Sequence, residues 1–211
     1  MLPDHAASAV LFDLDGVLVD STPIIERVWR AWADECGIDV GALMATVHGR
    51  PAREVIAETA PHLDADAETH RLDSWEMAHA AELLAMPGAL DCIALAQRHR
   101  WAIVTSGLRD LAMGRLDAIG LAVPEVFITA DDITRGKPDP EPYLLAAARL
   151  GVSAERCVVV EDAPAGVSAA KSAGMTAIGV ATTHAPAALA EADLVVGSMR
   201  AVHAELERLL G

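Results

Sequence analysis

The second part of the chain alternates between helix-like and strand-like segments, and this alternation constrains the fold more than any other feature. After the break at Met86-Pro87-Gly88, apolar residues at helical spacing alternate with short apolar runs typical of buried strands. Such alternation predicts parallel strands joined by helices. We therefore expect an α/β fold, in which helices cover both faces of a doubly wound parallel sheet.

The segments that we expect can be placed along the sequence. Strands are predicted over 9–12, 101–105, 126–129, 157–160, 177–180 and 194–196, and helices over 89–98, 109–119, 140–150, 166–173, 186–190 and 199–210. Residues 21–85 differ, because they show only helical patterns. One helix is expected to start at Ser21-Thr22-Pro23 and to end at Gly37, and others are expected over 41–46, 52–59 and 67–84. We expect a core formed by residues 1–20 and 86–211 and an all-helical domain, residues 21–85, inserted into it.

Composition limits the classes of partner. The 211 residues carry 16 Lys and Arg against 31 Asp and Glu, a formal net charge of −15, which argues against nucleic acid and anionic membranes as partners. The sequence contains no long uncharged apolar run and no basic leader at its start, so we expect a cytoplasmic protein. Its three cysteines, Cys36, Cys92 and Cys157, show neither disulfide nor zinc spacing.

Two aspartates follow the first predicted strand. Asp13 and Asp15 are one residue apart and precede Gly16, so both carboxylates leave the strand end on the same side. Two carboxylates held so close predict a shared proton or a bound divalent cation, and an oxygen-only site suits Mg²⁺. An Asp-Gly turn without function is the alternative for this pair alone.

Polar residues also follow the later strands, and each has a simpler interpretation. Thr105-Ser106-Gly107 has the composition of a helix cap, Lys137 that of a solvated loop charge, and Glu161-Asp162 that of a helix N-terminus. Ligands of parallel α/β sheets bind outside the carboxyl ends of the strands, where all these residues fall. Their coincidence at consecutive loops favours a site over four unrelated turns.

Phosphoryl transfer to a carboxylate is the chemistry that joins these residues. Asp13 would act as the nucleophile, and Asp15 would protonate the leaving alcohol and then deprotonate water. Mg²⁺ would be held by the carboxylates of Asp13 and Asp162 and by the main-chain carbonyl of Asp15. Glu161 is either a further ligand or a hydrogen-bond acceptor behind the ligands.

The remaining candidates would bind the phosphate. Ser106 and the amide of Gly107 would hold phosphate oxygens, and Lys137 would neutralise charge on the transferring group. We thus expect catalytic residues Asp13 and Asp15, phosphate-binding residues Ser106, Gly107 and Lys137, and metal-binding residues Asp13, Asp15 and Asp162.

Four motifs together resemble those of haloacid dehalogenase-like hydrolases: D-x-D-G at 13–16, T-S-G at 105–107, G-K-P-D-P at 136–140 and E-D-A-P-A-G at 161–166. The resemblance covers essentially the whole chain. It implies a Rossmann-like core, a helical cap inserted after the first motif, and the residue roles given above.

Segments 101–107, 136–144 and 158–166 are similar to those of sugar and glycerol phosphatases within this family. That similarity implies a Mg²⁺-dependent phosphatase of small sugar or polyol phosphates, such as hexose, hexitol, 2-deoxyglucose or glycerol phosphate. His48, Arg50 and Arg53 in the cap are candidates for reading sugar hydroxyls, although an ordinary surface role is equally compatible with the sequence.

Three alternatives remain open at this stage. A phosphosugar mutase such as β-phosphoglucomutase shares the same motifs, phosphoglycolate phosphatase is a third enzyme of the same type, and a protein that keeps the fold without catalysis is the non-enzymatic alternative. Asp15 disfavours a dehalogenase, because loss of halide needs no acid there. We expect a monomer, with Trp29 and Trp32 packed inside the cap.

Overall fold

The computed structural model describes residues 7–44, 46–47 and 50–211. Six parallel strands form one sheet in the order β5-β4-β1-β6-β7-β8. The strands are β1 (Ala9–Phe12), β4 (Arg100–Val104), β5 (Phe127–Ile128), β6 (Cys157–Glu161), β7 (Thr176–Val180) and β8 (Leu194–Val196). The prediction of a doubly wound parallel sheet is confirmed.

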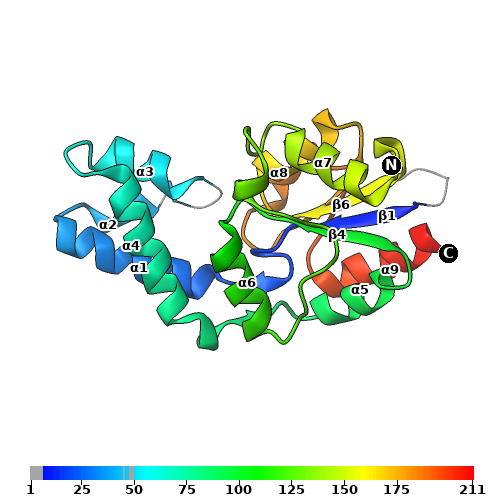
Figure 1. Ribbon diagram of the computed structural model, residues 1–211, viewed down its shortest axis with the longest axis horizontal. Coiled ribbons are helices and arrows are strands. Elements are labelled where there is room, and N and C mark those ends of the chain that lie inside the picture. Colours follow the sequence, from blue (N-terminus) through cyan, green and yellow to red (C-terminus); the bar gives the residue numbers. More distant parts are fainter. Residues whose placement is uncertain (1–6, 45, 48–49) are drawn as a thin grey trace.

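Helices cover both faces of this sheet (Figure 1). Val10, Phe12 and other alternate strand residues pack with α5 (Ala89–Ala96) and α9 (Met199–Leu210), while Leu11 and its neighbours pack with α7 (Glu141–Leu150) and α8 (Pro164–Ser172). Successive strand side chains point to opposite faces, so β1, which is buried throughout, has apolar residues at all four positions.

The remaining α-helices lie beyond one end of the sheet (Figure 1). α6 (Arg109–Ala118) follows β4, and the helices α1 (Thr22–Cys36), α2 (Val40–Met44), α3 (Ala52–Thr59) and α4 (Ala65–Ala78) form a separate lobe (Figure 1). Trp29 and Trp32 are buried on α1 and meet edge to face, with ring centroids 5.5 Å apart. The predicted packing of this pair within the helical lobe agrees with these contacts.

Two short strands join the lobes. β2 (Val19–Asp20) and β3 (Leu84–Ala85) pair antiparallel, with Val19 opposite Ala85. The predicted helix 67–84 therefore ends early, as α4 followed by the short 3₁₀ helix η1 (Ala80–Glu82). Strand pairing between the two connecting segments prevails over the helical propensity of residues 84–85. It also holds the segment that enters the insertion next to the segment that leaves it.

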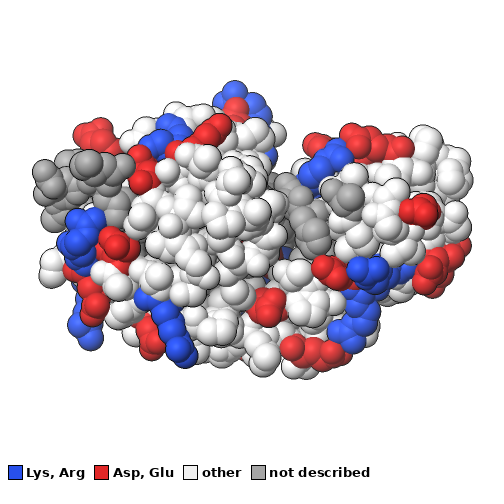
Figure 2. Space-filling model, turned by 180° about the vertical axis from the view of Figure 1, so that it is seen from behind, with Lys and Arg blue, Asp and Glu red and all other residues white. Residues whose placement is uncertain are grey.

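Short 3₁₀ helices occupy further loops. They are η2 (Ala130–Asp132), η3 (Ala154–Arg156) and η4 (Pro186–Leu189), and the last replaces the helix predicted over 186–190. Across the described residues, no helix is long and apolar enough to cross a membrane. On the face seen in Figure 2, acidic and basic side chains are interspersed, so the negative net charge is not gathered there into a single patch.

Candidate active site

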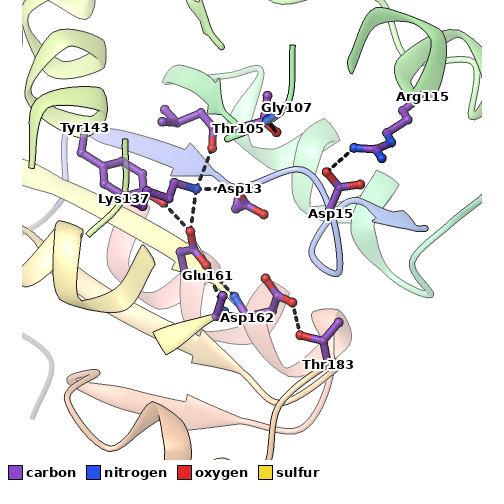
Figure 3. A network of polar contacts seen from close by, with 12 residues as sticks. Asp13, Asp15, Thr105, Gly107, Arg115, Lys137, Tyr143, Glu161, Asp162 and Thr183 are labelled. Carbon is purple, nitrogen blue, oxygen red and sulfur yellow. Dashed lines mark hydrogen bonds and ion pairs between the residues drawn. The ribbon is translucent and has the colours of Figure 1, made fainter. Parts of the chain in front are cut away.

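Asp13 and Lys137 form the centre of the site. Asp13 follows β1, the strand flanked by β4 and β6, and its backbone N–H donates to Val160 O of β6 at 3.0 Å. Lys137, from the loop before α7, donates through Nζ to Asp13 Oδ1 at 2.5 Å and to Val104 O at 3.0 Å. Both side chains are buried, so a carboxylate and its cation meet at the carboxyl end of the central strands (Figure 3).

Glu161 is the second partner of Lys137 and uses its full hydrogen-bonding capacity on the protein. Its Oε1 accepts from Lys137 Nζ at 2.6 Å and from the Tyr143 hydroxyl at 2.8 Å. Its Oε2 accepts from the backbone N–H groups of Asp162 and Ala163, both at 3.0 Å. Since each carboxylate oxygen already has two donors, this geometry makes Glu161 an anchor for Lys137.

Asp162 lies beside this cluster at the end of β6. Its Oδ2 accepts from the hydroxyl of Thr183, and the backbone carbonyl of Asp162 contacts Nδ1 of His184 at 3.1 Å. A Cβ at Gly16, which has φ +72°, would overlap the Asp162 carboxylate. Glycine is therefore required at position 16 for two reasons: the backbone has a positive φ, and a side chain would collide with Asp162.

A metal ion would fit the donor set. Carboxylate oxygens of Asp13 and Asp162, together with one of the hydrogen-bonded Glu161, lie within 4.8 Å of one another among the described residues, and those of Asp13 and Asp162 would be the ligands. Burial raises the pKa of Asp13 to about 7, with Glu161 and Asp15 adding to the rise and Lys137 opposing it. Burial and the charges of Glu161 and Asp13 likewise hold the pKa of Asp162 well above its usual range. A divalent cation would relieve this repulsion, and carboxylate oxygens suit Mg²⁺.

The lysine keeps its charge despite its burial. Desolvation alone would lower the pKa of Lys137, but Asp13 and Glu161 raise it well above the ordinary value. A buried lysine that stays positively charged is well suited to stabilise negative charge on a transferring phosphoryl group.

Asp15 is turned away from this cluster. Its Oδ2 accepts from Nη1 of Arg115 on α6 at 2.6 Å (Figure 3). Arg115 also binds Glu76 of α4. Asp15 Oδ1 is buried and has no hydrogen-bond partner among the described residues. The two carboxylates were expected to leave the strand end on the same side, but Lys137 binds that of Asp13 and Arg115 binds that of Asp15.

The second motif lies at the end of β4. Ser106 is exposed, and the N–H of Gly107 donates to Thr105 Oγ1 at 3.1 Å, while Gly107 O accepts from Ala130 N at 3.0 Å. Ser106 is thus free to meet a ligand, whereas the Gly107 amide would have to share its proton with Thr105.

Of the three candidates for reading sugar hydroxyls, Arg50 and Arg53 make their ion pairs outside the Asp13 cluster. Arg50 pairs with Glu58 at 2.7 Å and Arg53 with Asp66 at 2.5 Å, both within the helical lobe. His48 lies outside the described residues.

Sequence reasoning missed several residues of the site: Arg115, Tyr143, Thr183 and Glu76. Thr183 follows β7, the loop position at which the other candidates were found after their strands. Arg115 had a signal too, because it shares the buried face of α6 with Leu111, Ala112 and Leu116. A charged residue on an apolar helical face is seldom buried without a partner.

Comparison with known proteins identifies the family. Residues 7–174 match the sequence model of the haloacid dehalogenase-like hydrolase family. The chain belongs to this family. It is 41% identical over 198 residues to hexitol phosphatase A of Escherichia coli, with 91% of each chain covered. It is 37% identical over 188 residues to glycerol-1-phosphate phosphohydrolase 2 of Saccharomyces cerevisiae, covering 83% of this chain and 75% of that one.

Solved structures of the family agree with the fold. A family hydrolase from Deinococcus radiodurans, with bound phosphate and sodium, is 30% identical and superposes with a TM-score of 0.76 over 98% of this chain and 97% of that one. The expected membership of this family is confirmed, as is the resemblance to its sugar and polyol phosphatases.

Proposed function

We propose that this chain is a Mg²⁺-dependent phosphatase of small sugar or polyol phosphates that works through an aspartyl-phosphate. One observation carries the proposal: at the end of the central strand, Asp13 is held by a buried lysine next to Asp162. The relatives named as hexitol and glycerol phosphate hydrolases support this substrate class.

Asp13 would be the nucleophile. Lys137 holds only Oδ1, and no hydrogen bond to Oδ2 is found among the described residues, so one oxygen is available to attack phosphorus. In the first step a bond forms between the Asp13 carboxylate and phosphorus, and the bond to the leaving oxygen breaks. Ser106 and Lys137 would bind the phosphoryl oxygens, with the Gly107 amide sharing its donor between substrate and Thr105.

Asp15 would manage the protons. As a carboxylic acid it gives its proton to the leaving oxygen, which departs as a neutral alcohol. The resulting carboxylate then takes a proton from water as the water oxygen attacks phosphorus and the bond to Asp13 breaks. Phosphate is released, and Asp15 is protonated again for the next cycle.

The carboxylates of Asp13 and Asp162 and the main-chain carbonyl of Asp15 would hold Mg²⁺. When bound, the ion supplies positive charge that offsets repulsion between Asp13 and the phosphate dianion. Glu161 would position Lys137 and would not ligate the ion, because its oxygens are already occupied.

Residues 21–85 would act as a cap over a core formed by residues 1–20 and 86–211. The antiparallel pair β2-β3 supports this division, since it joins the two connecting segments at one place. Arg50 and Arg53 are paired within the lobe and would have to leave Glu58 and Asp66 to read a substrate. His48 remains a candidate from the sequence.

Phosphate release from hexose, hexitol, glycerol and glycolate phosphates with Mg²⁺ present tests the proposal. We expect turnover of hexose or polyol phosphates, loss of turnover in Asp13→Asn with the fold intact, and a strong loss or trapped phosphoprotein in Asp15→Asn. Isomerisation of a hexose phosphate without free phosphate would instead identify a mutase. Absence of any reaction with a generic aryl phosphate would contradict an enzymatic function.

A further inference from the structure

The side chain of Asp15 is held from one side only. Its Oδ2 accepts from Arg115, while Oδ1 is buried and has no hydrogen-bond partner among the described residues. In Figure 3, Arg115 approaches Asp15 from the side opposite to Asp13 and Lys137. Oδ1 is therefore the oxygen with unused capacity to carry a proton.

Arg115 is in turn fixed from the helical lobe. Its second terminal nitrogen, Nη2, binds Glu76 on α4, so one planar guanidinium joins a carboxylate of the core to one of the insertion. Arg115 is only 5% exposed. Two ion pairs thus connect α4, α6 and the loop after β1 in a single chain of contacts.

Stability alone does not account for an arginine at this position. It shares a helical face with Leu111, Ala112 and Leu116, where an apolar side chain would pack without the cost of burying a charge. Buried ion pairs are often no more stabilising than apolar residues of similar volume. The arrangement is better explained by the group that it holds.

We propose that Arg115 is a positioning residue that fixes the orientation of the Asp15 carboxyl group. Because Glu76 on α4 holds Arg115, the direction in which Asp15 Oδ1 points would depend on the position of α4 relative to α6. This inference rests on the proposed function, in which Asp15 transfers the proton to and from the reacting oxygens. It assigns a role in proton transfer to two residues, one in the core and one in the insertion, that do not touch the phosphate.

The proposal has a chemical signature, because proton donation matters in proportion to the basicity of the leaving oxygen. A polyol alkoxide needs the proton, whereas dinitrophenolate leaves without it. The ratio kcat/KM includes the step in which the leaving group departs but not the later attack by water. Misplacing Asp15 should therefore steepen the dependence of kcat/KM on leaving-group basicity.

We expect Arg115→Met to lower kcat/KM for glycerol phosphate by about tenfold to a hundredfold, and for dinitrophenyl phosphate by less than about threefold. Arg115→Lys should recover part of the loss, because it keeps the positive charge but lacks the planar fork in which Nη1 and Nη2 each hold one carboxylate. Glu76→Gln should give a smaller loss with the same selectivity. Arg27→Met, which removes the exposed pair with Glu82 in the insertion, is the matched control and should leave the ratio between the two substrates unchanged.

Three results distinguish the positioning role of Arg115 and Glu76 from the proton-transfer role of Asp15. Selective loss in Arg115→Met and Glu76→Gln, with Asp15→Asn showing the largest selectivity, supports the proposal. Selective loss in Asp15→Asn with equal losses for both substrates in the other two variants overturns it and leaves the proposed function standing. If Asp15→Asn itself shows no selectivity, the proton-transfer role fails and the positioning role with it. If Arg115→Met does not fold, as judged by circular dichroism, Glu76→Gln alone decides between the first two results.

Discussion

At the scale of single residues, folding changes the protonation of the Asp13 carboxyl group. Burial raises its pKa from the ordinary value of 3.8 to about 7, and Lys137 only partly opposes the rise. Between these two pH values the folded protein without metal binds more protons at this position than the unfolded chain does. Linkage then requires the free energy of unfolding to fall as pH rises through that window.

Asp13→Asn should remove this dependence. With a chelator present, we expect the free energy of unfolding of the variant, relative to the original protein, to increase between about pH 4 and pH 7. Urea titrations followed by tryptophan fluorescence at several pH values measure it. The charge of Asp13 also contributes to the raised pKa of Asp162, so its removal acts on Asp162 in the same direction and adds to the increase. A difference that stays constant across the window would show that the Asp13 carboxyl is not destabilised by burial.

The same scale shows what could be predicted from the sequence. Asp13 and Asp162 were found because each lies at or directly after a strand end, and Lys137 because it lies in the loop that follows β5. The fold brings these loops to one edge of the sheet. Arg115 and Glu76 were not found, because they lie within helices and meet only through the packing of α4 against α6. The contact between two helices distant in sequence is not encoded in a local motif.

At the scale of elements, α8 begins against the carboxyl group of Glu161. Gly166 lies in the first turn of α8, and a Cβ at this position would overlap that carboxyl group. The carboxyl cannot easily move aside, because four donors hold it. The close approach of α8 to the end of β6 therefore depends on glycine.

Gly166→Ala should displace Glu161 and, with it, Lys137. We expect a loss of stability of about 1–3 kcal/mol and a fall in kcat of at least about tenfold, measured by thermal unfolding and steady-state kinetics. Gly114→Ala is the control, because a Cβ at Gly114 on α6 meets nothing within 4 Å. That change should stabilise the protein by about 0.5–1 kcal/mol and leave kcat unchanged. Equal effects of the two variants would contradict the role given to Gly166.

Element boundaries were predictable where local signals and packing agree. The helix over 52–59, the strand over 194–196 and the final helix over 199–210 have the expected bounds. The predicted helix 67–84 was too long, since α4 ends at Ala78 and Leu84–Ala85 instead pairs with Val19–Asp20. That pairing joins residues that are 64 and 66 positions apart, so the sequence around Leu84 gives no local indication of it.

At the scale of the whole molecule, the net charge of −15 complicates any test for a specific metal. Added cations screen the repulsion among acidic groups and stabilise a compact acidic protein wherever they lie. A bound ion differs from this general effect because it acts only through its ligands. The comparison that separates the two must keep ionic strength constant and remove one ligand.

Mg²⁺ should raise the melting temperature of the original protein beyond the effect of KCl at the same ionic strength. A ligand at about a hundred times its dissociation constant contributes about 2.7 kcal/mol, which for a chain of this size corresponds to about 5–10 °C. In Asp162→Asn the excess should vanish, because the carboxylate that Thr183 holds beside Asp13 is gone. Differential scanning calorimetry of both proteins in the two salts measures it without any substrate. An excess retained in Asp162→Asn would place the Mg²⁺ ion outside the cluster at the end of β1 and β6.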